Sequence, residues 1–480
     1  MKKILLIGAT ALMVSNSTFA GGILTNTNQN AAYLRNPARD AVIAIDGVYS
    51  NPAGIAFLPQ GFHLSVSWQA AFQKRQIDAM GQMFMMNANN QSSDRYFEGT
   101  AKAPVIPSFQ AAYVINDKWS VSAQFAIGGG GGKCEFDNGL PMFEEMIGGA
   151  VAQNGGTSYA LNQQLTGKQY FFGLQVGATY RLAENFAVFG GLRGVLANCA
   201  YEGAIKNIKA NGMTASQYHA LSQQYAVSAQ QSATAAAKYT AMGMAMDAAK
   251  YAAMAEQYQA GAVQAGTVAA MIGDYMLDCS QSGFGITPII GLDWNLGKLN
   301  LAAKYEFRTK IDLENESNNS ANVDALMPAY KDGGKVRSDI PALMTLGAQY
   351  QITDAVKAMV GFHYYWDKDA KGSPIQKGDN TWEALLGVEW DVNDKIMLSC
   401  GGQRTDYNFD DADMSDINFN TPNYALNIGG AYKFSENMKL NVGYMHSFYE
   451  DHEVKNATSG ITRNYTRKND VVGVSLDIRF

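Results

Sequence analysis

Residues 472–480 read Val-Gly-Val-Ser-Leu-Asp-Ile-Arg-Phe. Apolar residues occupy every second position, and glycine or polar residues occupy the positions between them. Successive side chains of a β-strand point to opposite faces of a sheet. The alternation therefore predicts a strand with one apolar face and one polar face.

The same alternation recurs through most of the chain. In residues 299–307, for example, apolar side chains occupy the odd-numbered positions. We predict fourteen such strands: 62–72, 105–115, 119–127, 169–182, 186–198, 283–296, 299–311, 336–352, 355–367, 381–391, 395–407, 423–434, 438–450 and 468–480. An even number of antiparallel strands is the rule for single-chain bacterial barrels.

The connections between these strands alternate in length. Six are tight turns, at residues 116–118, 183–185, 297–298, 353–354, 393–394 and 435–437, and the seven between them are long. A barrel with short periplasmic turns and long outer loops has this pattern, whereas a β-sandwich or a propeller need not. We therefore predict an all-β fold, a 14-stranded antiparallel transmembrane β-barrel spanning 61–480. A large secreted β-sandwich or a propeller is the alternative.

Composition and targeting agree with a barrel in the bacterial outer membrane. The chain has 48 Gly and 25 Tyr, aromatic residues make up 11% and charged residues only 17%. Two lysines, an apolar run at 4–14 and Thr18-Phe19-Ala20 predict a signal peptide, residues 1–20. Without it the acidic residues exceed the basic ones, which argues against a nucleic-acid partner.

Residues 46–59 read Asp-Gly-Val-Tyr-Ser-Asn-Pro-Ala-Gly-Ile-Ala-Phe-Leu-Pro. Proline fixes φ and lacks an N–H, and glycine tolerates positive φ, so this stretch suits neither a strand nor a long helix. A compact apolar segment just before a closed ring of strands can be buried inside the ring. We therefore predict that residues 21–60 form a plug, or hatch, within the barrel. An ordered loop beneath the barrel is the alternative.

Five consecutive glycines, Gly128, Gly129, Gly130, Gly131 and Gly132, directly follow the third predicted strand. Glycine weakens a strand and marks bulges and bends. The run is expected to break the ladder to a neighbouring strand. It could be a flexible hinge into the next loop or a gap in the barrel wall.

A second outer loop, residues 201–280, is rich in Ala, Gln and Met, which favour helix. We predict a helical hairpin that breaks near Gly243 or Gly261. Cys199 and Cys279 flank this insert and could form a disulfide at its base, or both could remain free thiols.

Residues that could perform chemistry are sparse. The five histidines lack metal-ligand spacing, no Gly-x-Ser-x-Gly elbow occurs, and we expect neither enzymatic activity nor a cofactor or metal. Arg193, Lys304 and Arg308 are basic residues at strand positions that alternate with the apolar, lipid-facing ones, so we expect them to face the lumen. They could pair with acidic neighbours or with the plug, or one could hold a ligand carboxylate.

Several motifs, in this order, resemble the FadL-type family of outer-membrane long-chain fatty-acid transporters, which includes aromatic-hydrocarbon importers. Asn51-Pro52-Ala53, followed by Gly54, is similar to the family's hatch. Residues 119–135, 304–312, 339–341 and 442–446 resemble its third, seventh, eighth and thirteenth strands. The terminal Phe480 resembles the signal read by the barrel assembly machinery.

The resemblance implies passive uptake of hydrophobic molecules, above all long-chain fatty acids. Ligand would be captured by the loops after the third and fifth strands, and hatch movement would let it leave sideways into the bilayer. The glycine run would then be the gap in the wall. The expected surroundings are outer-membrane lipid and lipopolysaccharide, and the expected state is a monomer.

Other functions compete with transport. A surface-exposed structural or adhesin-type barrel would act through its large loops and would not need a plug. A lipid-modifying barrel enzyme would need a catalytic constellation, and an aqueous porin would not need a plug or apolar outer loops.

Overall fold

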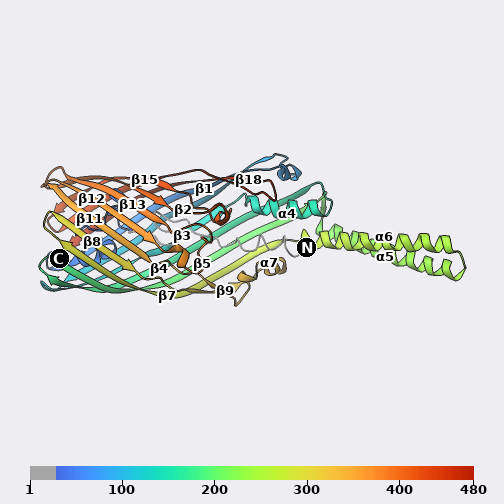
Figure 1. Cartoon of the computed structure of the whole chain (residues 1–480), viewed down its shortest axis with the longest axis horizontal. Coiled ribbons are helices and arrows are strands. Elements are labelled where there is room, and N and C mark those ends of the chain that lie inside the picture. The colour runs from blue at the N-terminus through green and yellow to red at the C-terminus, as the bar shows by residue number, and fades with distance from the viewer. Residues whose placement is uncertain (1–28) are drawn as a thin grey trace.

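Residues 29–480 are described by a computed structural model, and they form one barrel with helices at one end (Figure 1). The predicted signal peptide, 1–20, and the first part of the predicted hatch, 21–28, lie outside the described residues. All eighteen described strands belong to a single sheet, and the described sheet pairings are antiparallel.

Fourteen long strands build the wall, as predicted. They are β1 (Gly61–Met80), β2 (Asp94–Val114), β3 (Trp119–Phe136), β4 (Tyr159–Ala183), β5 (Phe186–Ala210), β7 (Tyr275–Asn295), β8 (Leu299–Glu306), β11 (Leu343–Thr353), β12 (Val356–Tyr365), β13 (Trp382–Asp391), β14 (Ile396–Asp406), β15 (Asn423–Ser435), β16 (Met438–Tyr449) and β18 (Thr462–Arg479). Short strands extend the ladder in the loops: β6 (Met213–Thr214), β9 (Asp312–Ser317), β10 (Lys335–Arg337) and β17 (His452–Lys455).

The C-terminal strand closes the barrel. β18 pairs with β1 from His63 opposite Arg479 to Met80 opposite Thr462, and the Phe480 N–H donates to the Phe62 carbonyl at 2.8 Å. Closure leaves no sheet edge, which satisfies the backbone groups of the first and last strands.

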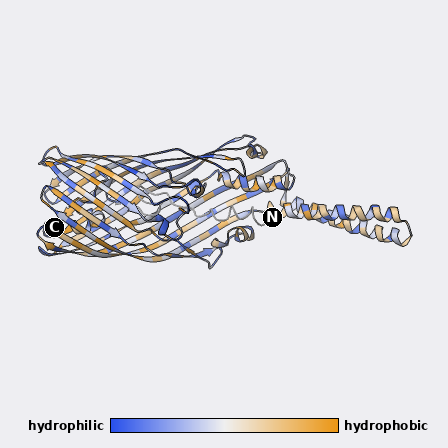
Figure 2. Cartoon of the chain, viewed as in Figure 1, coloured by the Kyte–Doolittle hydropathy of each residue, from blue (hydrophilic) through white to orange (hydrophobic). Residues whose placement is uncertain are grey.

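The two faces of the strands follow the sequence alternation. On β1, Ser65, Ser67 and Gln69 are buried inside, whereas Val66 and Trp68 are exposed outside. Alternating hydrophobic and hydrophilic stripes run along the whole wall (Figure 2). An apolar outer face and a polar inner face are typical of barrels that sit in a bilayer.

Two predicted strands are each interrupted. The predicted strand 299–311 is regular only over β8, and β9 begins one residue beyond its predicted end, whereas the predicted strand 336–352 is divided into β10 and β11. The segment between β8 and β9 is joined to the segment between β10 and β11 by one isolated antiparallel bridge, from Thr309 to Ile340. Pro341 follows directly and has no N–H to donate, which explains why regular pairing resumes only at Leu343.

The long helices lie at the loop end: α4 (Pro141–Gln153), α5 (Ala215–Ala241) and α6 (Ala245–Met271). α5 begins at a capping box between Thr214 and Gln217, and the hairpin turns at Gly243, whose φ is +73°. The helical part of the predicted insert, 201–280, is shorter than expected, because β5 continues to Ala210 and β7 already begins at Tyr275.

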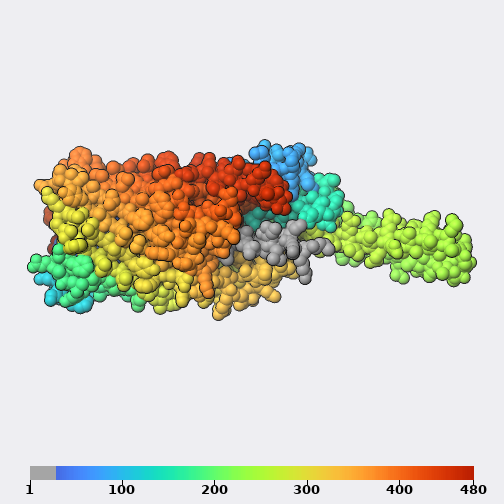
Figure 3. All heavy atoms as spheres, viewed as in Figure 1, coloured from blue at the N-terminus to red at the C-terminus, as the bar shows by residue number. Residues whose placement is uncertain are grey.

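The α5–α6 hairpin stands clear of the barrel (Figure 3). No helix within residues 29–480 is both long enough and apolar enough to cross a membrane. The remaining helical turns in the loops are short: η2 (Gln82–Met86), α7 (Ala321–Leu326), η3 (Pro328–Tyr330), η4 (Asp367–Asp369) and η5 (Asp411–Asp413).

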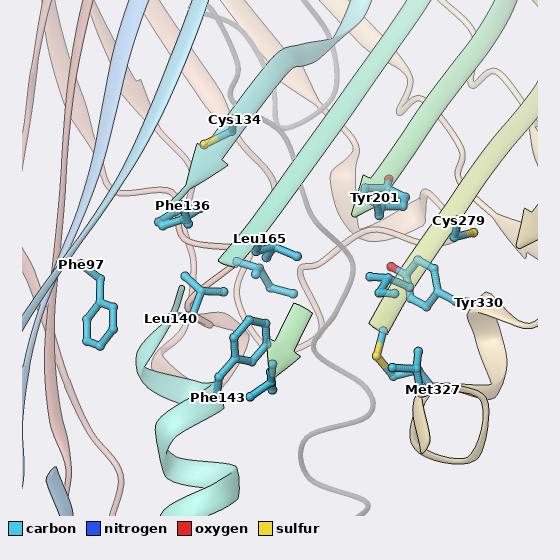
Figure 4. Packing of buried hydrophobic residues seen from close by; sticks show 14 of the residues in the cluster. Phe97, Cys134, Phe136, Leu140, Phe143, Leu165, Tyr201, Cys279, Met327 and Tyr330 are labelled. Atoms are coloured by element: carbon cyan, nitrogen blue, oxygen red, sulfur yellow. The ribbon is translucent and has the colours of Figure 1, made fainter. Parts of the chain in front are cut away.

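A large apolar cluster fills the loop end of the barrel. Phe97, Phe136, Leu140, Phe143 and Tyr330 are among its buried members, and strand ends pack there against α4 (Figure 4). This cluster gives the outer loops a fixed position above the lumen.

Candidate functional site

The N-terminal segment forms a compact plug in the lumen. It comprises α2 (Ala31–Arg35), α3 (Gly47–Ser50) and η1 (Pro52–Phe57), and most of its side chains are buried. Its helices are short because Pro37, Gly47 and Pro52 interrupt or restart them. We call residues 29–57 the hatch.

The Asn-Pro-Ala-Gly tip is docked on the wall by the Asn51 side chain. Its amide N–H donates to the Asp293 carboxylate of β7, and its carbonyl accepts from the Gly54 N–H at 3.2 Å. A Cβ at Gly54 would lie 2.4 Å from the Asn51 amide nitrogen. Only glycine therefore fits at position 54 while Asn51 reaches Asp293.

The wall also donates hydrogen bonds to hatch carbonyls. Gln175 of β4 donates to the Val48 carbonyl at 2.8 Å, and Lys304 of β8 donates to the Tyr49 carbonyl at 2.8 Å. These bonds satisfy hatch backbone groups that have no partner in a regular element.

A row of wall glycines lets the other half of the hatch approach the barrel closely. At Gly387 a Cβ would lie 1.8 Å from the side-chain oxygen Oδ1 of Asn36, and at Gly401 it would lie 2.5 Å from Pro37 Cδ. Seven successive strands each contribute one glycine of this kind: Gly347, Gly361, Gly387, Gly401, Gly429, Gly443 and Gly473. We call these seven residues the glycine row.

Buried ion pairs connect the hatch to the same side of the wall. Glu389 of β13 accepts from Arg35 at 2.6 Å and from Arg39 at 2.7 Å. Arg39 also pairs with Asp46 of the hatch at 2.8 Å. His363 of β12 lies between Asp40 of the hatch, at 3.0 Å, and a wall carboxylate.

The three basic residues selected from the sequence are not gathered at one point. Arg193 and Lys304 both pair with Glu306, at 2.6 Å and 2.7 Å. Arg308 is separate, partly exposed, and 3.6 Å from Asp339. Arg193 and Lys304 share the single negative charge of Glu306, and Lys304 also donates to the Tyr49 carbonyl of the hatch.

The wall ladder is interrupted between β2 and β3. Pairing stops after Ala101 opposite Cys134 and resumes at Phe109 opposite Phe125. Gly130 and Gly132 have φ of +81° and +77°, which favours glycine there. We call the interruption between residues 102–108 and 126–133 the wall gap.

Prolines supply the other side of the wall gap, a signal that the sequence analysis missed. Pro104 and Pro107 lie within the part of β2 that does not pair with β3, and neither has an N–H to donate to a ladder. The prolines of β2 and the glycine run of β3 lie at the same level of the barrel wall, and together they prevent regular pairing of the two strands.

The hatch residue Gln29 bridges this gap from inside. Its side-chain amide donates to the Ile127 carbonyl at 2.7 Å and accepts from the Ile127 N–H at 3.1 Å. Its own carbonyl accepts from the Ser108 hydroxyl of β2 at 2.8 Å. Gln29 thus replaces part of the missing ladder, and no sequence motif pointed to it.

All four cysteines are free in the structure, including Cys199 and Cys279, for which the sequence left a disulfide open. The two residues are buried on neighbouring strands but are offset by two positions, because Cys199 is opposite Gln281 and Cys279 is opposite Tyr201. The open alternative of free thiols is therefore the one that the structure shows.

A groove of about 1000 Å³ lies between the α5–α6 hairpin and the end of α4. Its lining is mostly alanine and glutamine, with Val263 on α6. The groove lies between the loops that follow β3 and β5. Within residues 29–480, no group of three or more His, Cys, Asp or Glu side chains could hold a metal ion.

The geometry defines this protein as a fourteen-stranded antiparallel β-barrel with an internal N-terminal plug. Neither a protein-family model nor a curated protein matches the sequence. Solved structures do match. A FadL homologue from Pseudomonas aeruginosa has a TM-score of 0.64 and 13% identity, covering 96% of this chain and 100% of its own.

Two toluene transporters share the architecture. TodX of Pseudomonas putida has a TM-score of 0.54 and 14% identity, covering 96% of this chain and 100% of its own. TbuX of Ralstonia pickettii has a TM-score of 0.51 and 12% identity, covering 95% and 99%. The chain therefore has the fold of FadL-type channels.

Replacing a member of the glycine row should unseat the hatch. Gly387→Val would place side-chain atoms where Asn36 lies, and overpacking costs about 1–3 kcal/mol. We expect faster hydrogen exchange in α2 of the variant, measured by mass spectrometry. Gly190→Val is the control, since no atom lies within 4 Å of a Cβ at Gly190. Unchanged exchange in Gly387→Val would show that the row does not seat the hatch.

Acid should loosen the hatch through Asp46. Burial opposes its charged form, but the Arg39 guanidinium outweighs this and holds the pKa of Asp46 below its usual value. A lowered pKa stabilises the docked state above about pH 4, and this contribution is lost as the pH falls through the lowered pKa. We expect channel conductance in planar bilayers to rise in that acidic range. In Asp46→Asn this step should be absent, and an identical pH profile in both proteins would contradict the assignment.

Proposed function

We propose that this protein is an outer-membrane channel for the passive uptake of hydrophobic molecules, with long-chain fatty acids as the main class. The observation that carries the proposal is the wall gap with a hatch residue, Gln29, bonded across it. A barrel that needed only a sealed wall would have no use for a gap beside a removable plug. The fold shared with FadL-type channels supports the same reading.

Capture takes place in the outer groove between α4 and the α5–α6 hairpin. Elsewhere at the loop end, Met83, Met86, Met142 and Met146 pack against the apolar cluster. Methionine is flexible and polarisable, so such a surface adapts to ligands of different shape. From there the ligand descends between the outer loops into the lumen.

Exit takes place sideways through the wall gap once the hatch residues beside it move. Ile106 and Ile127 border the gap and belong to a buried apolar cluster that also includes Leu34 of the hatch. Movement of an alkyl chain from water to hydrocarbon is favourable by about 0.8 kcal/mol per CH₂. The bilayer itself therefore supplies the driving force, and no energy source within the protein is needed.

A surface-exposed structural or adhesin-type barrel without transport is the second candidate. The observation in its favour is the α5–α6 hairpin, which projects beyond the barrel with Met242 and Met246 exposed near its tip. That function would not depend on hatch movement, so the experiment below separates the two candidates.

A reversible cross-link between hatch and wall tests the transport proposal. A Cβ at Gly291 would lie 3.4 Å from Pro52 Cγ, so Pro52→Cys with Gly291→Cys, in a background lacking the four native cysteines, can join the tip to β7. We expect the oxidised protein to stop accelerating fatty-acid uptake into liposomes and the reduced protein to regain it. Each single-cysteine variant is a control. Equal uptake by both forms would refute hatch-gated transport and favour the surface-protein candidate.

Removing the Gln29 bridge should open the gap. Gln29→Leu keeps a side chain of similar size but loses both hydrogen bonds to Ile127. At about 1 kcal/mol for each bond, the open population should rise roughly tenfold or more. We expect faster release of bound fatty acid into lipid vesicles, measured by stopped-flow fluorescence. Release at the wild-type rate would exclude Gln29 as part of the gate.

A further inference from the structure

A row of outward-facing lysines lies on the barrel wall where the apolar outer face ends. On β1 the run of outward-facing apolar residues ends at Phe72, and Lys74 is the next outward-facing residue. On four neighbouring strands a lysine also faces outward beyond the apolar residues. We call these five residues the basic belt: Lys468 of β18, Lys74 of β1, Lys102 of β2, Lys133 of β3 and Lys168 of β4.

The sheet register brings these lysines side by side. Lys74 is directly opposite Lys468, and Lys133 is directly opposite Lys168. Lys102 directly follows the outer part of the β2–β3 ladder, so it lies beside Lys133 at the outer end of the wall gap. Like charges directly opposite each other destabilise a sheet. An anion placed between these lysines would relieve the repulsion.

Most of the positive charge of the belt is available to a ligand. Glu98 accepts from Lys74 at 2.8 Å, and Glu135 pairs with Lys133. The other three lysines of the belt form no ion pair with a carboxylate of residues 29–480: Lys102, Lys168 and Lys468. The belt therefore carries more positive charge than its own acidic neighbours compensate.

The charge of the outer wall has the opposite sign on the strands that follow. Glu202 of β5 is directly opposite Asp278 of β7, and both are exposed just beyond the apolar outer face. Glu314 and Glu316 of β9 are exposed at a similar level. An anion in the outer leaflet is therefore favoured beside the wall gap and disfavoured at β5, β7 and β9.

A polar pocket of about 810 Å³ lies beyond the basic belt, between the outer ends of β2 and β4. It forms because β3 ends at Phe136, opposite Leu165, while β4 extends further outward to Tyr159. We call it the amide pocket. Five of its lining amides form no side-chain hydrogen bond within residues 29–480: Asn90, Asn138, Asn162, Gln164 and Asn207.

The lining of the amide pocket matches the chemistry of a saccharide. A side-chain amide offers both donors and an acceptor, and a sugar hydroxyl likewise donates and accepts. Arg95 is held by the fully buried Glu144, and its Nη1 group has no acceptor among the described residues. Tyr96 is 49% exposed at the same pocket, and its ring offers an apolar face to a sugar ring.

The belt and the pocket are spaced along the same outward-facing side chains. On β4, Gln164 and Asn162 lie four and six residues beyond Lys168, which is about 13 and 20 Å along the strand. On β2, Tyr96 lies six residues beyond Lys102, again about 20 Å. One ligand can therefore place acyl chains on the apolar wall, a phosphate at the belt and sugar residues in the pocket.

We propose that the basic belt and the amide pocket together bind a phosphorylated glycolipid of the outer leaflet, of the lipopolysaccharide class. Lysine suits the belt because an ammonium group forms charge-assisted hydrogen bonds with phosphate. Lipopolysaccharide was expected only as part of the surroundings, and this site gives it one defined side of the barrel. The site does not depend on the proposed transport function, although it holds the glycolipid beside the wall gap.

Binding to the full barrel in detergent, freed of bound lipid and titrated in native mass spectrometry, tests the belt. The probes are diphosphorylated lipid A and the same lipid A after dephosphorylation. The belt variant changes the three lysines without an ion pair: Lys102→Gln, Lys168→Gln and Lys468→Gln. The control variant removes the same charge from exposed lysines beside the short turns at the other end of the barrel: Lys298→Gln, Lys395→Gln and Lys433→Gln.

We expect the belt variant to bind diphosphorylated lipid A about 10- to 100-fold more weakly than wild type, because three lysines near a lipid surface are lost. The control variant should bind like wild type, and dephosphorylated lipid A should bind weakly to all three proteins. The belt is refuted if its variant binds like wild type, or if dephosphorylation leaves the affinity of wild type unchanged. A merely structural role would lower the melting temperature of the lipid-free belt variant and weaken both probes equally, which also contradicts the site.

A lipopolysaccharide that carries its core saccharide tests the amide pocket. Asn162→Ala with Gln164→Ala should weaken binding of this probe about tenfold and leave binding of lipid A unchanged, since lipid A does not reach the pocket. Equal affinity of the variant and wild type for the core-carrying probe would exclude the pocket from the site.

Two soluble probes distinguish a glycolipid site from its parts. If inorganic phosphate at constant ionic strength binds wild type as tightly as lipid A does, the belt is a free-anion site and the glycolipid assignment is wrong. If the free core saccharide binds as tightly as the whole lipopolysaccharide, the pocket is a site for soluble sugars and the assignment is also wrong. We expect both soluble probes to bind at least 100-fold more weakly than the glycolipid, because neither can use the apolar wall.

Discussion

Every backbone N–H and C=O in the hydrocarbon region of a membrane must find a partner within the protein. A closed barrel meets this requirement strand by strand, and β18 returning to β1 completes it. The wall gap departs from it, because Pro104 and Pro107 remove donors and the glycine run lets β3 bulge. Gln29 restores bonds to Ile127 from the lumen side. The docked hatch therefore restores part of the ladder that the wall lacks at the gap.

The hatch is held by contacts that can be broken and remade. Its fit depends on the glycine row, on the Asn51–Asp293 bond and on the ion pairs of Glu389. Buried ion pairs contribute little net stability because desolvation offsets their attraction, but they specify one geometry. These polar contacts give the plug a defined position in addition to its apolar contacts with the wall. This combination agrees with the hatch movement proposed above.

Much of the wall could be predicted from local pattern. Strand identity follows from period-two alternation, so β1 and β18 were found, although their outer ends were underestimated where the strands leave the bilayer and alternation weakens. Gly243 could be anticipated as the hairpin turn because only a few residues tolerate positive φ. The break near Pro341 was missed because the residues on both sides alternate well. The sequence left open whether Cys199 and Cys279 are bonded, because the register that offsets the pair by two positions is not visible in their spacing.

The sequence by itself determined the number of strands, their inward and outward faces, the alternation of short and long connections, and the helical insert. These features depend on residues close together in the chain. Only the tertiary structure decided what meets inside the lumen: Asn51 with Asp293, Gln29 with Ile127, and Arg75 with Arg467. The partners of these pairs are separated by 98 to 392 residues, and closing the ring sets their distance. The alternation along a strand tells which side chains face the lumen. It does not tell how far along the barrel axis a side chain lies, or which strands lie across the lumen from it. Closure, register and the seat of the hatch supply that information.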